Sequence, residues 1–524
     1  MKNRHVGMPR DDSLHQRVWA ARMTRRGLLA GAAGLGMASA RTSPPAAAAT
    51  PAVGESTGAV TVSRPGAGVG HAVGDPRGIY AVVMPGGGVE ARFGRMFKHL
   101  PPFEPSDELL QALAARMVES RPPLDDVRFS TDGLDNTDLP AGYTYLGQFV
   151  DHDMTRDTTP LSQQRQDPYA LINFDTPRFD LGSVYGRGPE LDPQLYDGRQ
   201  PGRLLLDEHD GVVDLPRTGT GTALLGDPRN DENLIICQMQ LAFIRLHNGF
   251  VDGGHSFADA QRLTRWHYQW LIVHDFLPRI VGQGLVDQIL VQTDQGLSVS
   301  NVFYKPTNRQ QPMMPVEYSA AAYRFGHSMI RAEYEIHERR TLPIFSVDGA
   351  DLRGSRPLSP DLVLDWNYFF EIPGMDPPDD RNFARLIDTQ VARPLATLPP
   401  TVITPGPGAI TALAARNLLR GKRLGLPAGQ DVANAMGLTV LSNVDLGLSE
   451  PGWGGKSPLW FYILKESEIL GGRRLGPVGA RIVTEVILGL LALDRTSYFN
   501  ARERFSPSAP TFTMGHLLRM ANVI

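Results

Sequence analysis

The sequence predicts a mainly helical protein with one large domain and little β-structure. Three observations support this prediction. First, 42% of the 524 residues are hydrophobic, which is ample for a large core. Second, apolar residues recur at helical spacing along most of the chain, whereas the alternating pattern of strands is rare. Third, no internal repeat or second long linker follows residue 75. We therefore expect one domain over residues 76–524.

Helical patterns follow one another along this domain. The first covers residues 107–120, with Ser106 or Asp107 as its N-cap. Residues 333–344 are expected to form a short hairpin. The run 486–493 is apolar throughout but too short to cross a membrane, so it belongs to a core helix. The other expected helices cover residues 143–154, 231–251, 257–281, 316–333, 409–420 and 479–493.

Residues 1–49 have the features of an export signal. Arg25 and Arg26 form a twin-arginine pattern, and the apolar stretch 28–40 that follows is too short for a permanent membrane anchor. The twin-arginine route predicts a secreted or periplasmic protein that folds before export. The alternative is a chance pair of arginines before an Ala-rich segment. Residues 50–75 are rich in Ala, Pro and Gly, which is typical of a flexible linker.

Charge and cysteine content exclude several classes of protein. Residues 1–49 carry a net charge of +6, which leaves about −10 on the remainder of the chain. An acidic domain has no general attraction for nucleic acid or anionic membranes, and we expect no integral membrane span. Cys237 is the single cysteine, so no intramolecular disulfide and no cysteine-based zinc site can form. Any metal must therefore be held by histidine and oxygen ligands.

The first candidate site is the segment Gly-Gln-Phe-Val-Asp-His-Asp at residues 147–153. On a helix, Gln148 and His152 lie one turn apart on one face, so both can point into one pocket. Asp151 and Asp153 then point elsewhere and are available for two other tasks. The segment by itself predicts a buried polar cluster whose purpose depends on partners later in the chain.

Three later clusters supply such partners, at residues 226–233, 323–327 and 416–420. Arg229 and Glu232 are three residues apart and are expected to share a helix face. Haem iron is commonly held by one neutral imidazole whose other ring nitrogen is oriented by a neighbouring acceptor. Peroxide cleavage needs a base that moves a proton and a cation that stabilises the separating charge. The clusters contain all of these groups.

Together, the four clusters resemble the animal-type haem peroxidase superfamily, in one of its bacterial secreted branches. The similarity covers residues 143–427, more than half of the chain. The motifs Gln-x-x-Asp-His-Asp, Arg-x-x-Glu, Arg-x-Gly-His and Asn-x-x-Arg are each weak, but their combination in this order is very specific. The resemblance implies a helical haem peroxidase fold that binds haem b.

The resemblance assigns the reacting groups residue by residue. It makes His152 the distal acid and base, Gln148 the distal glutamine and Arg229 the distal arginine. His327 becomes the proximal iron ligand, and Asn417 the residue that accepts a hydrogen bond from the proximal imidazole. A lone histidine in an apolar helix is usually a core residue, but the joint presence of the four clusters favours iron ligation by His327.

Other residues are assigned to the edge of the haem. Arg324 and Arg420 match arginines near the propionates or the proximal face, although either could instead be an ordinary ion-pair residue. Asp151 and Glu232 match carboxylates that form ester bonds to haem methyl groups in many members. The alternatives are a hydrogen bond to backbone or calcium-loop groups for Asp151 and a helix first-turn carboxylate for Glu232. Asn233 stands where a third link would need methionine, so that link cannot form.

The resemblance also implies a calcium site. Asp153, the Thr176 side chain and carbonyl, the Arg178 carbonyl and Asp180 supply the hard oxygen donors that calcium prefers. Gly182 occupies the position of the last side-chain ligand and has no side chain. Calcium is thus expected with an incomplete ligand set.

We expect from these motifs a peroxidase that reduces hydrogen peroxide to water and oxidises a halide, thiocyanate or a small aromatic donor. One alternative is a fatty-acid dioxygenase of the same superfamily, which places a radical-forming tyrosine three residues before the proximal histidine. Arg324 occupies that position here, and Tyr323 is one residue away. Another alternative is a non-catalytic haem carrier or adhesion protein, which would not need Gln148, His152 and Arg229.

Overall fold

The computed structural model describes residues 93–120, 133–155, 177–293, 296–306, 312–347, 349–403, 409–509 and 511–524. All of them belong to one compact unit, Gly68–Ile524. This part is mainly helical, and its strands form only two-stranded ladders, which confirms the predicted fold class. The export signal over 1–49 and the linker over 50–75 lie outside the described residues, and the domain boundaries stay a prediction.

The helices, in chain order, are α3 (Asp107–Arg116), α4 (Gly142–Met154), α5 (Gly182–Tyr185), α6 (Leu234–Asp252), α7 (Phe257–Leu271), α8 (Leu277–Val281), α9 (Gln283–Ile289), α10 (Val316–Ser319), α11 (Leu413–Arg423), α12 (Gly429–Ala435), α13 (Leu459–Ile469), α14 (Pro477–Leu493) and α15 (Met514–Met520). The paired strands are β1 (Phe93–Gly94) with β7 (Met314–Pro315), β2 (Asp135–Pro140) with β10 (Phe383–Arg385), β3 (Asp207–His209) with β4 (Val212–Asp214), β5 (Leu290–Thr293) with β6 (Gly296–Val299), and β8 (Glu333–His337) with β9 (Arg340–Pro343). The last pair is the predicted hairpin.

Local capping explains where two helices begin. The Ser106 side chain accepts a hydrogen bond from the N–H of Leu109, so α3 starts at the predicted N-cap. The long apolar helix α6 begins later than predicted, because Asn233 caps it by accepting from the N–H groups of Ile235 and Ile236. The polar residues before this cap form a separate 3-10 turn, η4 (Pro228–Asp231), rather than the first turn of the helix.

The helix predicted over 316–333 is wrong. The structure has the short α10, then the 3-10 turn η6 (Ala322–His327), and β8 already begins at Glu333. Ala321 leaves the helical region with φ −134° and ψ −74°. This break lets the rings of Tyr318 and Tyr323 stack with centroids 4.7 Å apart. On a continuous helix, residues five apart point about 140° away from each other and could not stack.

The helix predicted over 257–281 is interrupted rather than straight. Its middle is a π-helical turn, η5 (Ile272–Phe276), between α7 and α8. Pro278 follows directly. Proline lacks the N–H that would bond to the carbonyl four residues earlier, and its ring crowds that carbonyl, which accounts for the widened turn.

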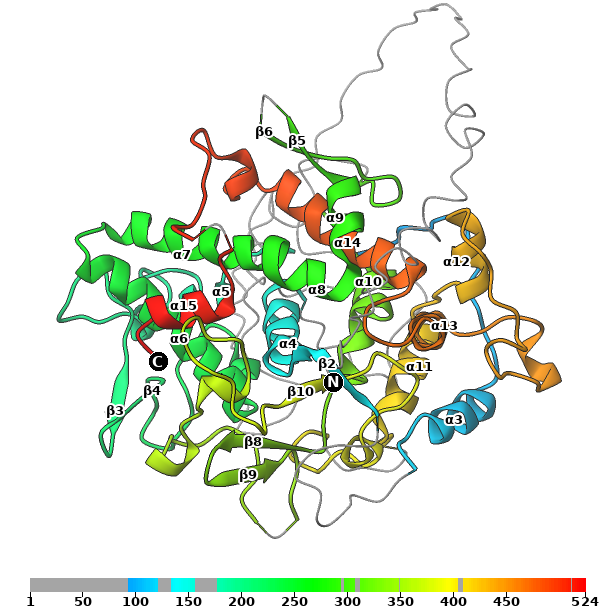
Figure 1. The fold of residues 1–524 in the computed structure, drawn as a ribbon, viewed down its shortest axis with the longest axis horizontal. Helices are drawn as coiled ribbons and strands as arrows, with labels where there is room; N and C mark the ends of the chain where they lie inside the picture. Colours follow the sequence, from blue (N-terminus) through cyan, green and yellow to red (C-terminus); the bar gives the residue numbers. More distant parts are fainter. Residues whose placement is uncertain are drawn as a thin grey trace, which may run out of the picture. The chain divides into compact units, whose positions relative to one another are not determined.

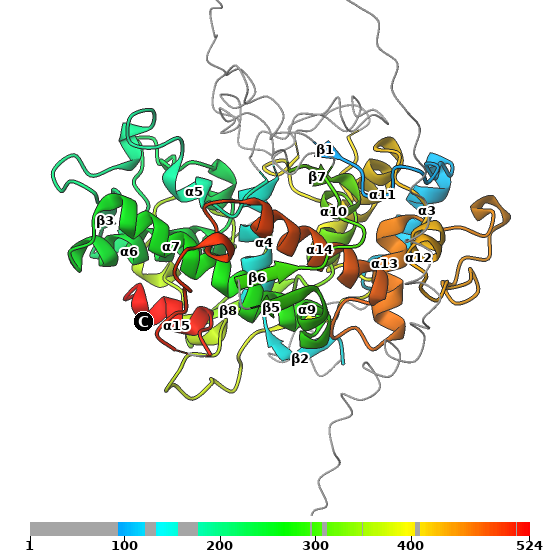
Figure 2. The same cartoon turned by 90° about the horizontal axis from the view of Figure 1, so that it is seen from above.

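α4 lies in the middle of the helical arrangement. In both views α6 and α7 lie on one side of it, and α10 and α11 lie on the other (Figure 1, Figure 2). The helix contacts α6, η4, η6 and β10. Ten of its residues are buried, including His152 and Asp153. The first candidate segment therefore contacts η4 and η6, which carry two of the other three clusters.

Among the described helices, α6 is the one that is long and apolar enough to cross a membrane, judged by length and composition alone. Of its apolar window, 78% is buried inside the protein. A buried core helix of a soluble protein passes the same test, so this is weak evidence. The expectation of no integral span stays a prediction.

Because of Glu466 on α13, the free energy of unfolding should depend on pH. Its carboxyl is buried and accepts from the N–H of Val478 at 2.9 Å. Burial raises its pKa from 4.5 to about 8. The stability contributed by the protonated form is therefore complete below pH 4.5 and is lost as the pH rises through about 8. Glu466→Gln should remove a decline of about 1.4 kcal/mol per pH unit from the free energy of unfolding.

Urea denaturation of both proteins at pH values of about 5 and 8 measures this difference. Equal changes with pH in wild type and Glu466→Gln would contradict the prediction.

Candidate functional site

α4 holds His152 against the 3-10 turn η4. The imidazole is 4% exposed, and its Nδ1 lies 2.7 Å from Oδ1 of Asn230. Gln148 is half-buried one turn earlier on the same helix, as the spacing predicted. The contact with Asn230 was not anticipated from the sequence. Asn230 directly follows Arg229 in the sequence, but no local pattern shows that its side chain turns towards His152.

The two aspartates of the segment face different neighbours, as predicted. Oδ1 of Asp151 accepts from the hydroxyl of Thr155 at 3.0 Å. Asp153 is fully buried, and its carboxylate accepts from the backbone N–H groups of Leu181 at 3.0 Å and Gly182 at 2.8 Å. The first contact is to a side-chain hydroxyl at the end of α4 and leaves the ester at Asp151 a prediction; the second ties α4 to the start of α5.

Arg229 reaches the main chain of His152 and is held there by an aspartate. Its Nε and Nη2 donate to the Asp227 carboxylate at 2.6–3.1 Å. Nη2 also donates to the main-chain carbonyl of His152 at 2.9 Å. Asp227 is completely buried, and a charge-assisted pair of this kind orients a guanidinium strongly. Asp227 was missed, although an acidic residue two positions before an arginine in a turn is a usable signal.

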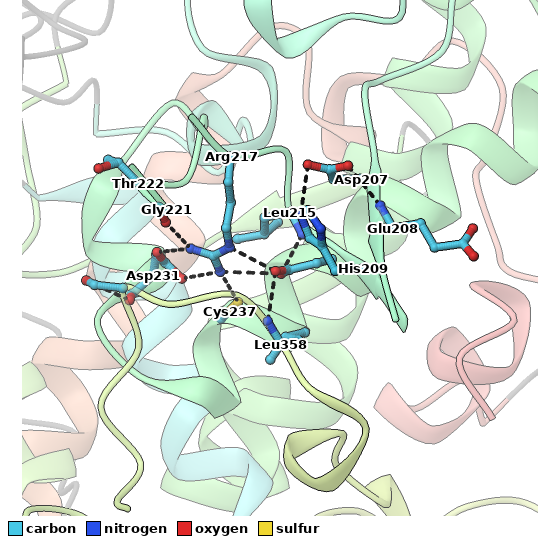
Figure 3. A network of polar contacts seen from close by, with 12 residues as sticks. Asp207, Glu208, His209, Leu215, Arg217, Gly221, Thr222, Asp231, Cys237 and Leu358 are labelled. Carbon is cyan, nitrogen blue, oxygen red and sulfur yellow. Dashed lines mark hydrogen bonds and ion pairs between the residues drawn. The ribbon is translucent and has the colours of Figure 1, made fainter. Parts of the chain in front are cut away.

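A second ion pair supports the same turn from outside (Figure 3). Arg217 places its guanidinium between two carboxylates, donating to Asp214 at 2.8 Å and to Asp231 at 2.7 and 3.0 Å. It also donates to the carbonyl of Gly221 at 3.0 Å. The Arg217 side chain is 2% exposed. Since Asp231 closes η4, Arg217 helps to fix the turn that carries Arg229.

Cys237 lies at the edge of this network. Its sulfur is 3.7 Å from Nη2 of Arg217, and Figure 3 shows it on the α6 side of the guanidinium. The cysteine is 1% exposed, and burial raises the pKa of its thiol well above the ordinary value. A buried, protonated thiol is a packing group rather than a nucleophile.

The proximal residues meet as predicted, but with one hydrogen bond reversed. Nδ1 of His327, at the end of η6, lies 2.7 Å from Nδ2 of Asn417 on α11. Oδ1 of Asn417 accepts from Nη1 of Arg324 at 3.0 Å. We expected Asn417 to accept from the imidazole. Because a guanidinium can only donate, Arg324 takes the amide oxygen and turns the amide nitrogen towards His327.

Three arginines converge on Asp151. Removal from water raises the pKa of its carboxyl, and the charges of Arg229, Arg324 and Arg420 each act to lower it. The structure therefore brings together cations from η4, η6 and α11 that are far apart in the sequence. Guanidinium groups suit paired carboxylates such as the two propionates of haem.

The described residues fit a haem group. His327 supplies an imidazole whose Nδ1 contacts the side-chain amide of Asn417; iron ligation through Nε2 requires Nδ1 to carry the hydrogen and the amide oxygen to face it. A Cβ placed on Gly326 would meet no described atom within 4 Å, so there is open space at the residue that precedes His327. Of the three arginines around Asp151, Arg324 and Arg420 could supply positive charge for the propionates. Glu232 is half-buried after η4, and its main chain pairs with that of Gly354.

The predicted calcium ligands are only partly placed. Thr176 lies outside the described residues. The N–H of Gly182 donates to Oδ1 of Asp153 at 2.8 Å and to Oδ1 of Asp180 at 3.1 Å, so two of the proposed carboxylates meet at one amide. Arg178 lies two residues before Asp180. Within the described ranges, no group of three or more His, Cys, Asp or Glu residues gathers as a metal site. Calcium binding stays a prediction.

Comparisons with known proteins agree with this geometry. Residues 148–447 match the sequence profile described as animal haem peroxidase, which covers more than half of the chain. Chorion peroxidase from Aedes aegypti is 27% identical over 183 residues, and that from Drosophila melanogaster is 26% identical over 181 residues. These alignments cover 31% and 30% of this chain but only 22% of each relative. The chain thus aligns with about a fifth of the length of these relatives.

Two solved structures share the fold. Peroxidase A from Dictyostelium discoideum superimposes with a TM-score of 0.59 at 17% identity, covering 83% of this chain and 94% of its own. A fatty acid alpha-dioxygenase from Arabidopsis thaliana gives a TM-score of 0.53 at 15% identity, covering 83% and 76%. At these identities the similarity establishes the fold.

Proposed function

Because the chain belongs to the animal haem peroxidase family, we propose that it binds haem b and reduces hydrogen peroxide to water while oxidising a halide, thiocyanate or a small aromatic donor. The observation that supports this most is the pairing of buried His152 with half-buried Arg229, joined by the 2.9 Å bond from Nη2 to the histidine carbonyl. A haem carrier or adhesion protein needs only the proximal imidazole and has no use for such a pair.

His327 would hold the iron, and Arg324 and Arg420 would face the propionates. When bound, haem supplies the metal centre at which peroxide binds and from which the donor is oxidised. His152 takes a proton from one peroxide oxygen and returns it to the other, which leaves as water. Arg229 stabilises the negative charge that builds on the departing oxygen. Gln148, on the same helix face as His152, orders water or halide in the pocket.

Several finer features belong to the proposal. Asp151 and Glu232 are the candidate sites for ester links to haem. Asp153, Thr176, Arg178 and Asp180 are the candidate calcium ligands. The twin-arginine segment would direct the protein to the periplasm or the exterior, as in a bacterial secreted branch of the family. Acid extraction under denaturing conditions followed by mass spectrometry tests the ester links, because freely released haem excludes them.

A dioxygenase is the second candidate function, and one observation favours it. The hydroxyl of Tyr323 is buried and makes no hydrogen bond of ordinary geometry with the described residues. Its ring stacks on that of Tyr318 near Phe276. The position three residues before His327 is still occupied by Arg324, whose guanidinium is bound to Asn417. The peroxidase is therefore the better-supported activity.

The test uses the full chain loaded with haem. We expect a Soret band, oxidation of iodide or of a small phenol that requires hydrogen peroxide, and no oxygen uptake with a long-chain fatty acid. His327→Ala should lose the Soret band, because no other imidazole has been assigned to the iron. Failure of the wild type to take up haem would overturn the proposal. Fatty-acid oxygenation that disappears in Tyr323→Phe would establish the dioxygenase instead.

A further inference from the structure

We propose that Asn230 and Gln240 are positioning residues that fix which nitrogen of His152 carries its proton. The inference rests on the proposed function, since it concerns the histidine that acts as base there. It follows from a chain of hydrogen bonds that begins at a backbone carbonyl and ends at the imidazole.

The chain starts at Ser183 in α5. Its carbonyl can only accept, and it receives the N–H of Gly226 at 2.8 Å and Nε2 of Gln240 at 2.9 Å. The amide of Gln240 is therefore oriented with its nitrogen towards Ser183. Its oxygen Oε1 faces the other way and accepts from Nδ2 of Asn230 at 2.9 Å.

The orientation of these two amides determines which atom of Asn230 faces His152. Since Nδ2 of Asn230 is the donor to Gln240, the atom that faces the imidazole is Oδ1, at 2.7 Å from Nδ1. An amide oxygen can only accept, so Nδ1 of neutral His152 must carry the hydrogen. The lone pair is then on Nε2, the nitrogen that a base needs for proton abstraction.

Burial makes the arrangement rigid. Asn230 and Gln240 are completely buried, and His152 is 4% exposed, so little water competes for these bonds. Reversing either amide would set donor against donor or acceptor against acceptor at a dry site, which is costly. Four elements contribute to the chain, namely α4, η4, α5 and α6, and the tautomer of His152 is thus decided by the tertiary structure.

The test follows the binding of hydrogen cyanide to the ferric haem protein, in which the distal base removes a proton from the ligand. This readout needs no peroxidase turnover, so it can fail or succeed independently of the proposed function. We expect Asn230→Leu to slow cyanide association by about 10–100-fold, the range seen when a metal-bound histidine loses the partner that orients it. Gln240→Leu should slow it less, because Oδ1 of Asn230 remains near His152.

Two further variants distinguish a lost hydrogen bond to His152 from a general disturbance of the fold. Gln238→Leu is the matched control, since Gln238 is a buried glutamine on the same helix that bonds to Leu362 and Leu364 instead. Its association rate should stay at the wild-type value. Asn230→Asp keeps an acceptor towards His152 but sets its second oxygen against Oε1 of Gln240, so it should recover only part of the rate lost in Asn230→Leu. The proposal is overturned if Asn230→Asp is as slow as Asn230→Leu, or if Gln240→Leu and Gln238→Leu are affected equally.

Discussion

His152→Ala is expected to lower kcat/KM for hydrogen peroxide by about 10²–10⁴-fold, the usual contribution of a positioned acid and base. The imidazole is the buried group that can move a proton between the two peroxide oxygens, and Arg229 cannot replace it because a guanidinium does not give up its proton. Steady-state peroxidation with a small phenol measures the effect.

His209→Ala is the matched control for this variant. His209 lies on β3 and its side chain is 43% exposed, so its loss should leave turnover unchanged. Both variants should keep the Soret band, because neither residue is the candidate iron ligand. Turnover in His152→Ala at the wild-type rate would exclude the proposed proton transfer.

Arg217→Met is expected to lower the free energy of unfolding by about 3–5 kcal/mol, the usual cost of removing one partner from a buried ion pair. Methionine keeps much of the apolar volume but leaves the carboxylates of Asp214 and Asp231 without their shared cation. These two side chains are 0% and 6% exposed, so water cannot replace the guanidinium. Urea denaturation at neutral pH measures the change.

The comparison for this variant is Arg262→Met. Arg262 pairs with Asp259 on the surface, with side chains 48% and 41% exposed, and such a pair contributes at most about 1 kcal/mol. Similar losses of unfolding free energy in the two variants would show that the network in Figure 3 contributes little to stability. If the network fixes η4, Arg217→Met should also weaken peroxide turnover through Arg229 and Asn230.

Much of the fold was predictable from local pattern. α3, α4 and α14 follow from apolar residues at helical spacing, and the cap at Ser106 follows from one side chain and the next turn. These features depend on neighbours within a few residues. The break at Ala321 was not predictable, because it accompanies the stacking of Tyr318 and Tyr323, a packing arrangement that the helical pattern of residues 316–333 does not contain.

The candidate site, like the fold, was only partly predictable from the sequence. The sequence by itself determined the candidate residues, because four motifs in a fixed order contain the imidazoles, arginines and amides that the proposed chemistry needs. Only the tertiary structure decided their partners: Asp227 and Arg217 around η4, Asn230 beside His152, and Arg324 on the oxygen of Asn417. Residue types show what can donate or accept. The direction of each bond is set by groups that folding brings from up to 93 positions away.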